Sequence, residues 1–278
     1  MIKKYKVLKN HLTEFQKVKK FTIAFNNIDL LFYDKFTLFL QNDKKHTNNT
    51  VSKYFDLLKT FLRWATERNS NNKTDFQKFK TATEKTDIIY LTENELLSIY
   101  NKDLSNNKAL DKVRDVFCFA CFTGARFSDV SSLKKEDIRG KNWYLRTTKT
   151  KDVLQIPLNE YAIEILNKYS DCERVLPVIS SQKTNQHLKE LCKLAEIDDP
   201  ITIVKYRGAE RIEEIYPKYE LVSTHCARRS FVTLSLEKGM RAETVMEITG
   251  HSNYKTFKKY IKITSKVKEI EMNNIWKK

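Results

Sequence analysis

Two side chains that could carry out chemistry lie nine residues apart near the end of the chain. The stretch 250–260 holds His251 and, at the end of a short run that predicts one helix, Tyr260. A phenol is a poor nucleophile at neutral pH because its unperturbed pKa is about 10. Tyr260 would therefore need an electrophile held in place and cations that favour the phenolate. The stretch itself contributes Lys255, Lys258 and Lys259.

Three upstream segments offer further cationic or proton-carrying side chains. Arg126 follows Thr-Gly-Ala between two predicted helices, where backbone N–H groups also point at an anion. Lys149 lies at the turn between two predicted strands. His225 and Arg228 are three residues apart, which places them on one face of a predicted helix start. Together these residues could hold and attack a phosphate group.

The composition predicts a globular protein with a polyanionic partner. Of the 278 residues, 41% are hydrophobic and 12% are aromatic, which argues against disorder. The formal net charge of +16 makes nucleic acid the first candidate partner and an anionic membrane surface the second. No stretch approaches the roughly 20 apolar residues of a spanning helix. No amphipathic helix is left over for a membrane surface, and no secretory signal opens the chain, so a cytoplasmic protein is expected.

Five cysteines without an export signal argue against a disulfide framework. Cys118 and Cys121 form a CxxC pattern inside the apolar run 116–122. No second pair completes a zinc site, and no βαβ context suggests a redox site. We interpret both residues as helix core, and we predict no metal site.

The hydrophobic pattern predicts a mainly α chain with a small β component, an α+β fold. Residues 29–40 and 51–65, with 5–18 as a third segment, predict a small all-α domain at 1–70. Residues 71–88 are polar and are interpreted as a linker, followed by a mixed helical domain at 89–278 with a tail from 261. Residues 1–88 hold 18 Lys and Arg against 9 Asp and Glu, which leaves 33 against 26 for the rest. Both parts are basic, so both could face the same polyanion.

The larger part opens with a predicted capping box at Thr92 and Glu95. Two strands are predicted at 143–147 and 153–157, and 202–215 predicts a hairpin that turns at Gly208. Helices are predicted at 109–122, from about 128, and at 160–168, 182–195, 226–238, 242–249, 254–261 and 267–275.

This order and spacing of residues resembles the tyrosine recombinase, or phage integrase, family, of the mobile-element integrase type. The resemblance covers about residues 91–265 as a catalytic domain and extends, through the helical pattern alone, to an N-terminal core-binding domain. Each motif is weak by itself, but six in register are very specific. No catalytic position is substituted, which favours an active enzyme. The residues that carry the resemblance are Arg126 in Thr-Gly-Ala-Arg-Phe-Ser-Asp, Lys149 eight residues before Pro157, His225-x-x-Arg228, Gly250-His251 and Tyr260.

The resemblance implies transesterification without a cofactor or a metal. Tyr260 would attack the scissile DNA phosphate, form a 3′-phosphotyrosine and release a 5′-hydroxyl. Arg126 and Arg228 would hold the non-bridging oxygens, because a planar guanidinium gives bidentate contacts and stays charged. Lys149 would protonate the leaving 5′ oxygen.

The remaining roles follow from the same resemblance. His225 would assist proton transfer at Tyr260, and His251 would hydrogen-bond the phosphate or position its neighbours. Asp129 would support Arg126. Taken singly, each of these side chains has an ordinary interpretation as a helix cap, a core group or a solvated surface residue.

Further basic residues are expected at the DNA. Lys151 competes with Lys149 for the catalytic role, and the spacing to Pro157 favours Lys149. Arg229 is interpreted as a phosphate or structural contact. The expected DNA-contact residues are Lys44, Lys45, Lys53, Lys151, Arg229 and Lys255.

The implied function is site-specific recombination that integrates or excises a mobile element. The implied partners are double-stranded DNA, further subunits in a tetramer on two sites, and accessory DNA-bending proteins, all at the cytoplasmic nucleoid. Two alternatives stay open: a type IB-like topoisomerase, which relaxes supercoils with the same nucleophile, and an inactive architectural DNA-binding protein. The small helical domain and the compact size favour recombination.

The tail and the start of the chain carry two further expectations. In this family a tail such as residues 261–278 can dock into a neighbouring subunit, and here it holds Val267, Ile270, Met272, Ile275 and Trp276 in an otherwise polar run. Packing on its own subunit is the alternative. Many mobile-element integrases also carry an arm-site-binding domain ahead of the core-binding domain. We expect either a recombinase without that domain or a longer natural chain.

Overall fold

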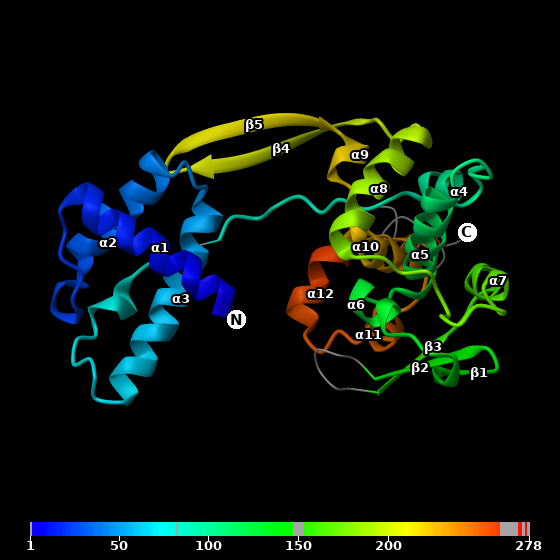
Figure 1. Cartoon of the computed structure of the whole chain (residues 1–278), viewed down its shortest axis with the longest axis horizontal. Coiled ribbons are helices and arrows are strands. Elements are labelled where there is room, and N and C mark those ends of the chain that lie inside the picture. Colours follow the sequence, from blue (N-terminus) through cyan, green and yellow to red (C-terminus); the bar gives the residue numbers. More distant parts are fainter. Residues whose placement is uncertain (1, 82, 147–152, 262–271, 274–275, 277–278) are drawn as a thin grey trace. The chain divides into compact units, whose positions relative to one another are not determined.

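The computed structural model describes residues 2–81, 83–146, 153–261, 272–273 and 276 (Figure 1). The chain divides into two compact units, each described by itself. Unit 1 contains Met1–Asp87 and Thr202–Ile215, and unit 2 contains Ile88–Ile201 and Tyr216–Lys278. Helices dominate, with two small sheets, so the predicted α+β class is confirmed. None of the described helices is long and apolar enough to cross a membrane.

Unit 1 is built on three helices, as the apolar spacing predicts. They are α1 (Ile2–Lys19), α2 (Leu30–Leu38) and α3 (Asn48–Glu67), with a π-helical turn at Phe39–Asp43 and a 3₁₀ turn at Phe25–Asn27. Asp29 caps α2, because its carboxylate accepts a hydrogen bond of 2.9 Å from the Phe32 amide. The core between the helices is largely aromatic and includes Phe15, Phe32, Phe36, Phe39 and Phe55.

Part of the segment predicted as a linker belongs to the core of unit 1. Phe76 lies in a 3₁₀ helix (Asp75–Lys78), and both Phe76 and Phe79 are buried in the aromatic cluster. The Phe79 ring stacks on Tyr33 with centroids 5.1 Å apart, and its carbonyl accepts a hydrogen bond of 2.9 Å from Lys59 Nζ. Two phenylalanines in a polar sequence give no periodic pattern, although burying them is favourable. Residues 75–79 are therefore anchored.

A strand pair, β4 (Pro200–Arg207) and β5 (Glu210–Pro217), forms the predicted hairpin. Its turn contains Gly208 in the left-handed conformation, with φ of +60°. The Asn48 carboxamide binds the backbone of Gly208 twice, accepting from its N–H at 2.7 Å and donating to its carbonyl at 2.9 Å. These contacts hold residues 202–215 in unit 1.

Unit 2 combines a three-stranded antiparallel sheet with short helices. Strands β1 (Ile138–Arg139), β2 (Asn142–Arg146) and β3 (Val153–Pro157) lie in that order, and Trp143 is opposite Ile156. The predicted pairing of β2 with β3 and the capping box at Thr92 are confirmed. Strand β1, with two residues, and helix α9, with four, were not predicted because such short elements have no periodic pattern. The predicted helix 267–275 falls almost wholly outside the described residues. The helices are α4 (Glu93–Tyr100), α5 (Lys108–Thr123), α6 (Phe127–Ser131), α7 (Glu160–Lys168), α8 (Ser181–Leu194), α9 (Lys218–Leu221), α10 (Thr224–Glu237), α11 (Ala242–Thr249) and α12 (Tyr254–Ile261), with a 3₁₀ turn at Lys135–Asp137.

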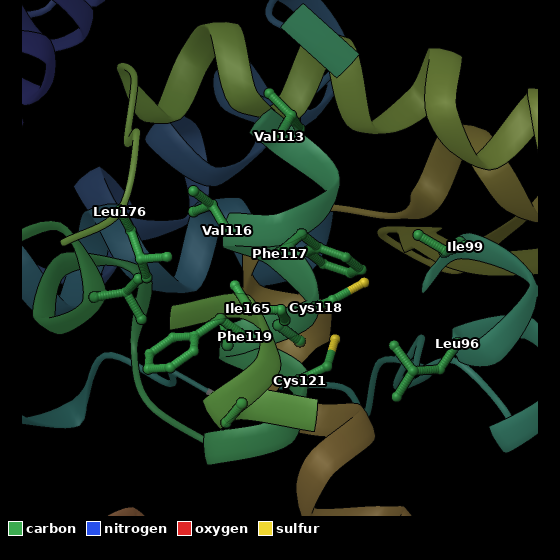
Figure 2. Packing of buried hydrophobic residues seen from close by; sticks show 14 of the residues in the cluster. Leu96, Ile99, Val113, Val116, Phe117, Cys118, Phe119, Cys121, Ile165 and Leu176 are labelled. Atoms are coloured by element: carbon green, nitrogen blue, oxygen red, sulfur yellow. The ribbon is translucent and has the colours of Figure 1, made fainter. Parts of the chain in front are cut away.

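Helix α5 is the centre of unit 2. Figure 2 shows Phe119 on the side of Ile165, and Cys118 and Cys121 on the side of Leu96. Residues 116–121 of α5 are apolar and buried around the whole helix, and α5 packs against α4, α7, α8 and α10. The prediction that both cysteines are core residues is confirmed. Burial raises the pKa of both thiols, so they stay protonated and unreactive.

A cluster of charges also ties α5 to α7. Asp115 is buried and accepts hydrogen bonds from Arg114 Nε at 2.9 Å, Lys168 Nζ at 2.7 Å and the Tyr169 hydroxyl at 2.7 Å. Asp111 pairs with the same arginine and lysine. The buried carboxylate is thus compensated by two cations and a hydroxyl, as burial of a charge requires.

Candidate active site

Arg228 on α10 is 4% exposed, and the ends of two other helices hold its guanidinium. Nη1 donates to the carbonyl of Gly124 at 3.0 Å, and Nη2 donates to the carbonyl of Thr249. Gly124 ends α5 and Gly250 ends α11, both in the left-handed conformation with φ of +68° and +63°. The last carbonyls of a helix lack partners within it and carry partial negative charge. They therefore compensate this buried cation.

Side chains of unit 2 pack closely against both glycines. A Cβ on Gly124 would lie 2.8 Å from Cε1 and 2.9 Å from Cγ of Phe231. A Cβ on Gly250 would lie 2.8 Å from Cδ1 of Leu154. The Thr-Gly pairs at 123–124 and 249–250 thus form the carbonyl cradle of Arg228, and their repetition at two helix ends was the unused signal in the sequence.

His251 follows the end of α11 and lies against the same cradle. Its Nδ1 is 2.7 Å from Thr249 Oγ1 and 3.3 Å from Arg228 Nη2. Its ring is edge-on to Tyr260, with centroids 6.0 Å apart. The structure therefore brings together His251, Arg228 and Tyr260, as the sequence predicts.

Tyr260 lies on α12 and is only 3% exposed. It packs with Phe257 and with apolar side chains of α10 and α11. Burial raises the pKa of Tyr260, while the charges of Arg229 and Arg228 act in the opposite direction. The phenol is thus a buried group whose ionised form depends on neighbouring cations.

Arg126 and Asp129 stand at the start of α6, next to this group. Arg126 Nη1 is 3.7 Å from Oδ2 of the buried Asp129 carboxylate. Burial and the charge of Arg126 lower the pKa of Arg228 to about 10, although Tyr260 and Asp129 oppose this. The guanidinium groups of Arg126 and Arg228 repel each other beside the phenol of Tyr260. An anion bound between them would relieve this repulsion, so the site is suited to an anion.

The structure separates one predicted pair by depth. His225 lies in the first turn of α10 and is exposed, whereas Arg228 is buried. The two residues lie on the same side of the helix, but α10 becomes buried after its first turn. A spacing of three residues indicates the shared side and does not indicate this difference in burial. Lys149 and Lys151 lie outside the described residues.

The expected DNA contacts have different surroundings. Lys45, Lys53 and Lys255 are exposed, whereas Lys44 forms an ion pair with Glu14. Arg229 is half-buried beside Tyr260. Within the described part of the chain, no three His, Cys, Asp or Glu side chains gather in a way that could hold a metal ion.

The sequence pattern of the phage integrase family matches residues 90–266. The chain belongs to the phage integrase family. The SAM-like domain of phage integrases matches residues 1–81. The predicted family, and with it the class of tyrosine-type site-specific recombinases, is thereby confirmed in preference to the topoisomerase and the inactive binding protein.

Relatives of this family member extend over most of its length. A probable integrase/recombinase of Acholeplasma phage L2 is 22% identical over 94% of the chain and 85% of the relative. A lambda integrase dimer bound to a COC′ core site is 18% identical, with a TM-score of 0.67 over 92% of the chain and 88% of that structure. A lambda integrase tetramer bound to a Holliday junction is 17% identical, with a TM-score of 0.65 over 92% of the chain and 71% of that structure. The two structures share the fold of this integrase.

Proposed function

We propose that the protein is a site-specific DNA recombinase that cleaves and rejoins DNA through Tyr260, and that it integrates and excises a mobile element. One observation carries the proposal. A buried phenol lies beside His251 and two mutually repelling guanidinium groups, in a chain of the phage integrase family. A scissile phosphate would relieve the repulsion and supply the electrophile.

The proposed step conserves the energy of the DNA backbone bond. Tyr260 Oη attacks phosphorus and loses its proton, with His225 assisting, and a 3′-phosphotyrosine forms. The bond from phosphorus to the 5′ oxygen breaks, and Lys149 supplies the proton that this oxygen needs. Arg126 and Arg228 hold the non-bridging oxygens, whose charge increases in the transition state. Attack by the 5′-hydroxyl of a partner strand then reverses the step.

His251 and Asp129 have positioning roles in this proposal. The contacts of His251 with Arg228 and Thr249 fix its ring, so it can hydrogen-bond the phosphate or keep Arg228 oriented. The Asp129 carboxylate orients Arg126 across 3.7 Å.

The assembly is proposed from the same family membership. Unit 1 would serve as the core-binding domain and unit 2 as the catalytic domain, on double-stranded DNA. The relatives include a dimer on a core site and a tetramer on a Holliday junction, which supports a tetramer of this chain on two sites. We place its action in the cytoplasm, at the nucleoid, with accessory DNA-bending proteins as further partners.

A suicide substrate with a nick beside the cleavage site of the element's own ends tests the proposal. The wild type should become covalently linked to the 3′ end, and Tyr260→Phe should bind this DNA without linking. Binding without linkage by the wild type would leave only an architectural protein. Relaxation of one plasmid without exchange between two sites would instead indicate a topoisomerase.

A further inference from the structure

One stripe of α10 faces the nucleophile. His225, Arg229, Val232 and Leu236 follow each other at spacings of four, three and four, which places them on one side of a helix. Val232 and Leu236 pack in the same buried cluster as Tyr260, and α10 contacts α12 directly. Arg229 therefore lies between His225 and the apolar contacts of Tyr260. Arg228 occupies the neighbouring stripe, which faces the carbonyl cradle.

The guanidinium of Arg229 has a buried donor that is unsatisfied among the residues that the structure describes. Its Nε is buried without a hydrogen bond, and no described residue forms an ion pair with it. Arg228, its neighbour, instead donates to two helix-end carbonyls. A buried donor of a charged group that stays unsatisfied destabilises the folded state. Such a cost is offset when a negative charge forms next to the group.

The charge of Arg229 acts on Tyr260 directly. Of the two cations that oppose the effect of burial on the pKa of Tyr260, Arg229 has the larger influence and Arg228 the smaller. Among the described residues, the titratable side chain of His251, from the turn before α12, also contacts Tyr260. The side chains that α11 contributes to this cluster, such as Val245, are apolar.

We propose that Arg229 is a positioning residue for the nucleophile, whose cation stabilises the negative charge that develops on the Tyr260 oxygen as it attacks. The proposal rests on the function proposed for Tyr260 and goes beyond it, because the two phosphate-holding arginines are Arg126 and Arg228. The third cation serves the attacking oxygen. As the phenol proton leaves with the assistance of His225, Oη carries negative charge beside Arg229, until the bond from Oη to phosphorus is complete and the bond from phosphorus to the 5′ oxygen has broken.

Loss of this cation should appear as a shift of the pH profile. A charge next to a titrating group typically moves its pKa by about 1 or more, which corresponds to about tenfold in rate below the pKa. Arg229→Gln should therefore lower the cleavage rate about tenfold near neutral pH and displace its rise towards alkaline pH. Arg229→Lys keeps the charge and should retain most of the rate.

The experiment measures single-turnover formation of the covalent complex at saturating DNA, across pH. The substrate carries a 5′-bridging sulfur at the scissile phosphate, because a thiolate leaves without a proton and the rate then reports the attack of Tyr260. Arg174→Gln, which removes an exposed arginine of unit 2, is the matched control and should match the wild type.

Two outcomes would overturn the proposal. If Arg229→Gln weakens DNA binding but keeps the wild-type rate and pH profile at saturating DNA, Arg229 is only a phosphate contact. If Arg229→Gln loses the same fraction of the rate at every pH, and Arg229→Lys does not restore the rate, Arg229 is a structural residue.

A direct titration separates this proposal from the proposed function. In protein labelled with ¹³C-tyrosine, with the signal assigned by Tyr260→Phe, the pKa of Tyr260 should rise in Arg229→Gln. An unchanged titration refutes the role of Arg229 even if the wild type forms no covalent complex. Failure of that complex, with the shift present, would refute only the proposed recombinase reaction.

Discussion

Gly124→Ala tests whether the end of α5 needs glycine for packing as well as for conformation. The residue has φ of +68°, where an L-residue with a side chain costs about 1–2 kcal/mol. Its Cβ would also lie 2.9 Å from Cγ of Phe231, so moving only the far edge of that ring would not make room. Forcing a methyl group into a packed site costs about 1–3 kcal/mol. The free energy of unfolding should therefore fall by about 2–5 kcal/mol.

Gly140→Ala is the matched control. Gly140 has φ of +58°, but no atom lies within 4 Å of its added Cβ, so only the conformational cost of about 1–2 kcal/mol applies. Urea unfolding followed by circular dichroism measures both variants, and melting temperatures should fall by about 2–4 °C for each kcal/mol lost.

The same substitution should impair the site. The Gly124 carbonyl accepts from Arg228, so a displaced helix end moves the guanidinium. Covalent-complex formation should decrease more in Gly124→Ala than in Gly140→Ala at equal folded fraction. Equal losses of stability in the two variants would refute the packing argument.

Further predictions concern the charged groups. Asp115→Asn removes the buried carboxylate but leaves Lys168 and Arg114 paired with Asp111. It should cost about 1–3 kcal/mol of unfolding free energy, measured in urea, and an unchanged stability would contradict the network's role. In Arg228→Lys a single ammonium cannot reach both carbonyls, so the variant should lose cleavage activity and about 1–3 kcal/mol of unfolding free energy. A fully active variant would contradict the role of the two carbonyls. Because burial raises the pKa of Tyr260, the phenol is protonated at neutral pH, and single-turnover cleavage should rise with pH between about 6 and 9; a flat profile would exclude phenol ionisation from the rate. DNA affinity, measured by fluorescence anisotropy, should fall steeply with salt, whereas a flat dependence would argue against a largely electrostatic interface.

The sequence determined which local elements form. Apolar spacing places the helices at 109–122 and 160–168 within about one residue of α5 and α7, because helix periodicity is a local property. The six-part motif determined the family and nominated Arg126, Arg228, His251 and Tyr260, which the fold brings to one place. Residue type alone was informative there because the proposed reaction requires a nucleophile and guanidinium groups.

The partners of these groups follow from the tertiary structure. Phe76 and Phe79 join an aromatic core from a polar segment, since burial depends on residues distant in sequence. The carbonyls that hold Arg228 come from the ends of two helices. A Thr-Gly pair marks each end in the sequence, but residue type does not indicate which side chain donates to these carbonyls. In the sequence, Arg229 is one of many basic residues. The packing of α10 on α12 places its charge beside Tyr260. The sequence does not show this, because the effect of a charge depends on its distance and burial.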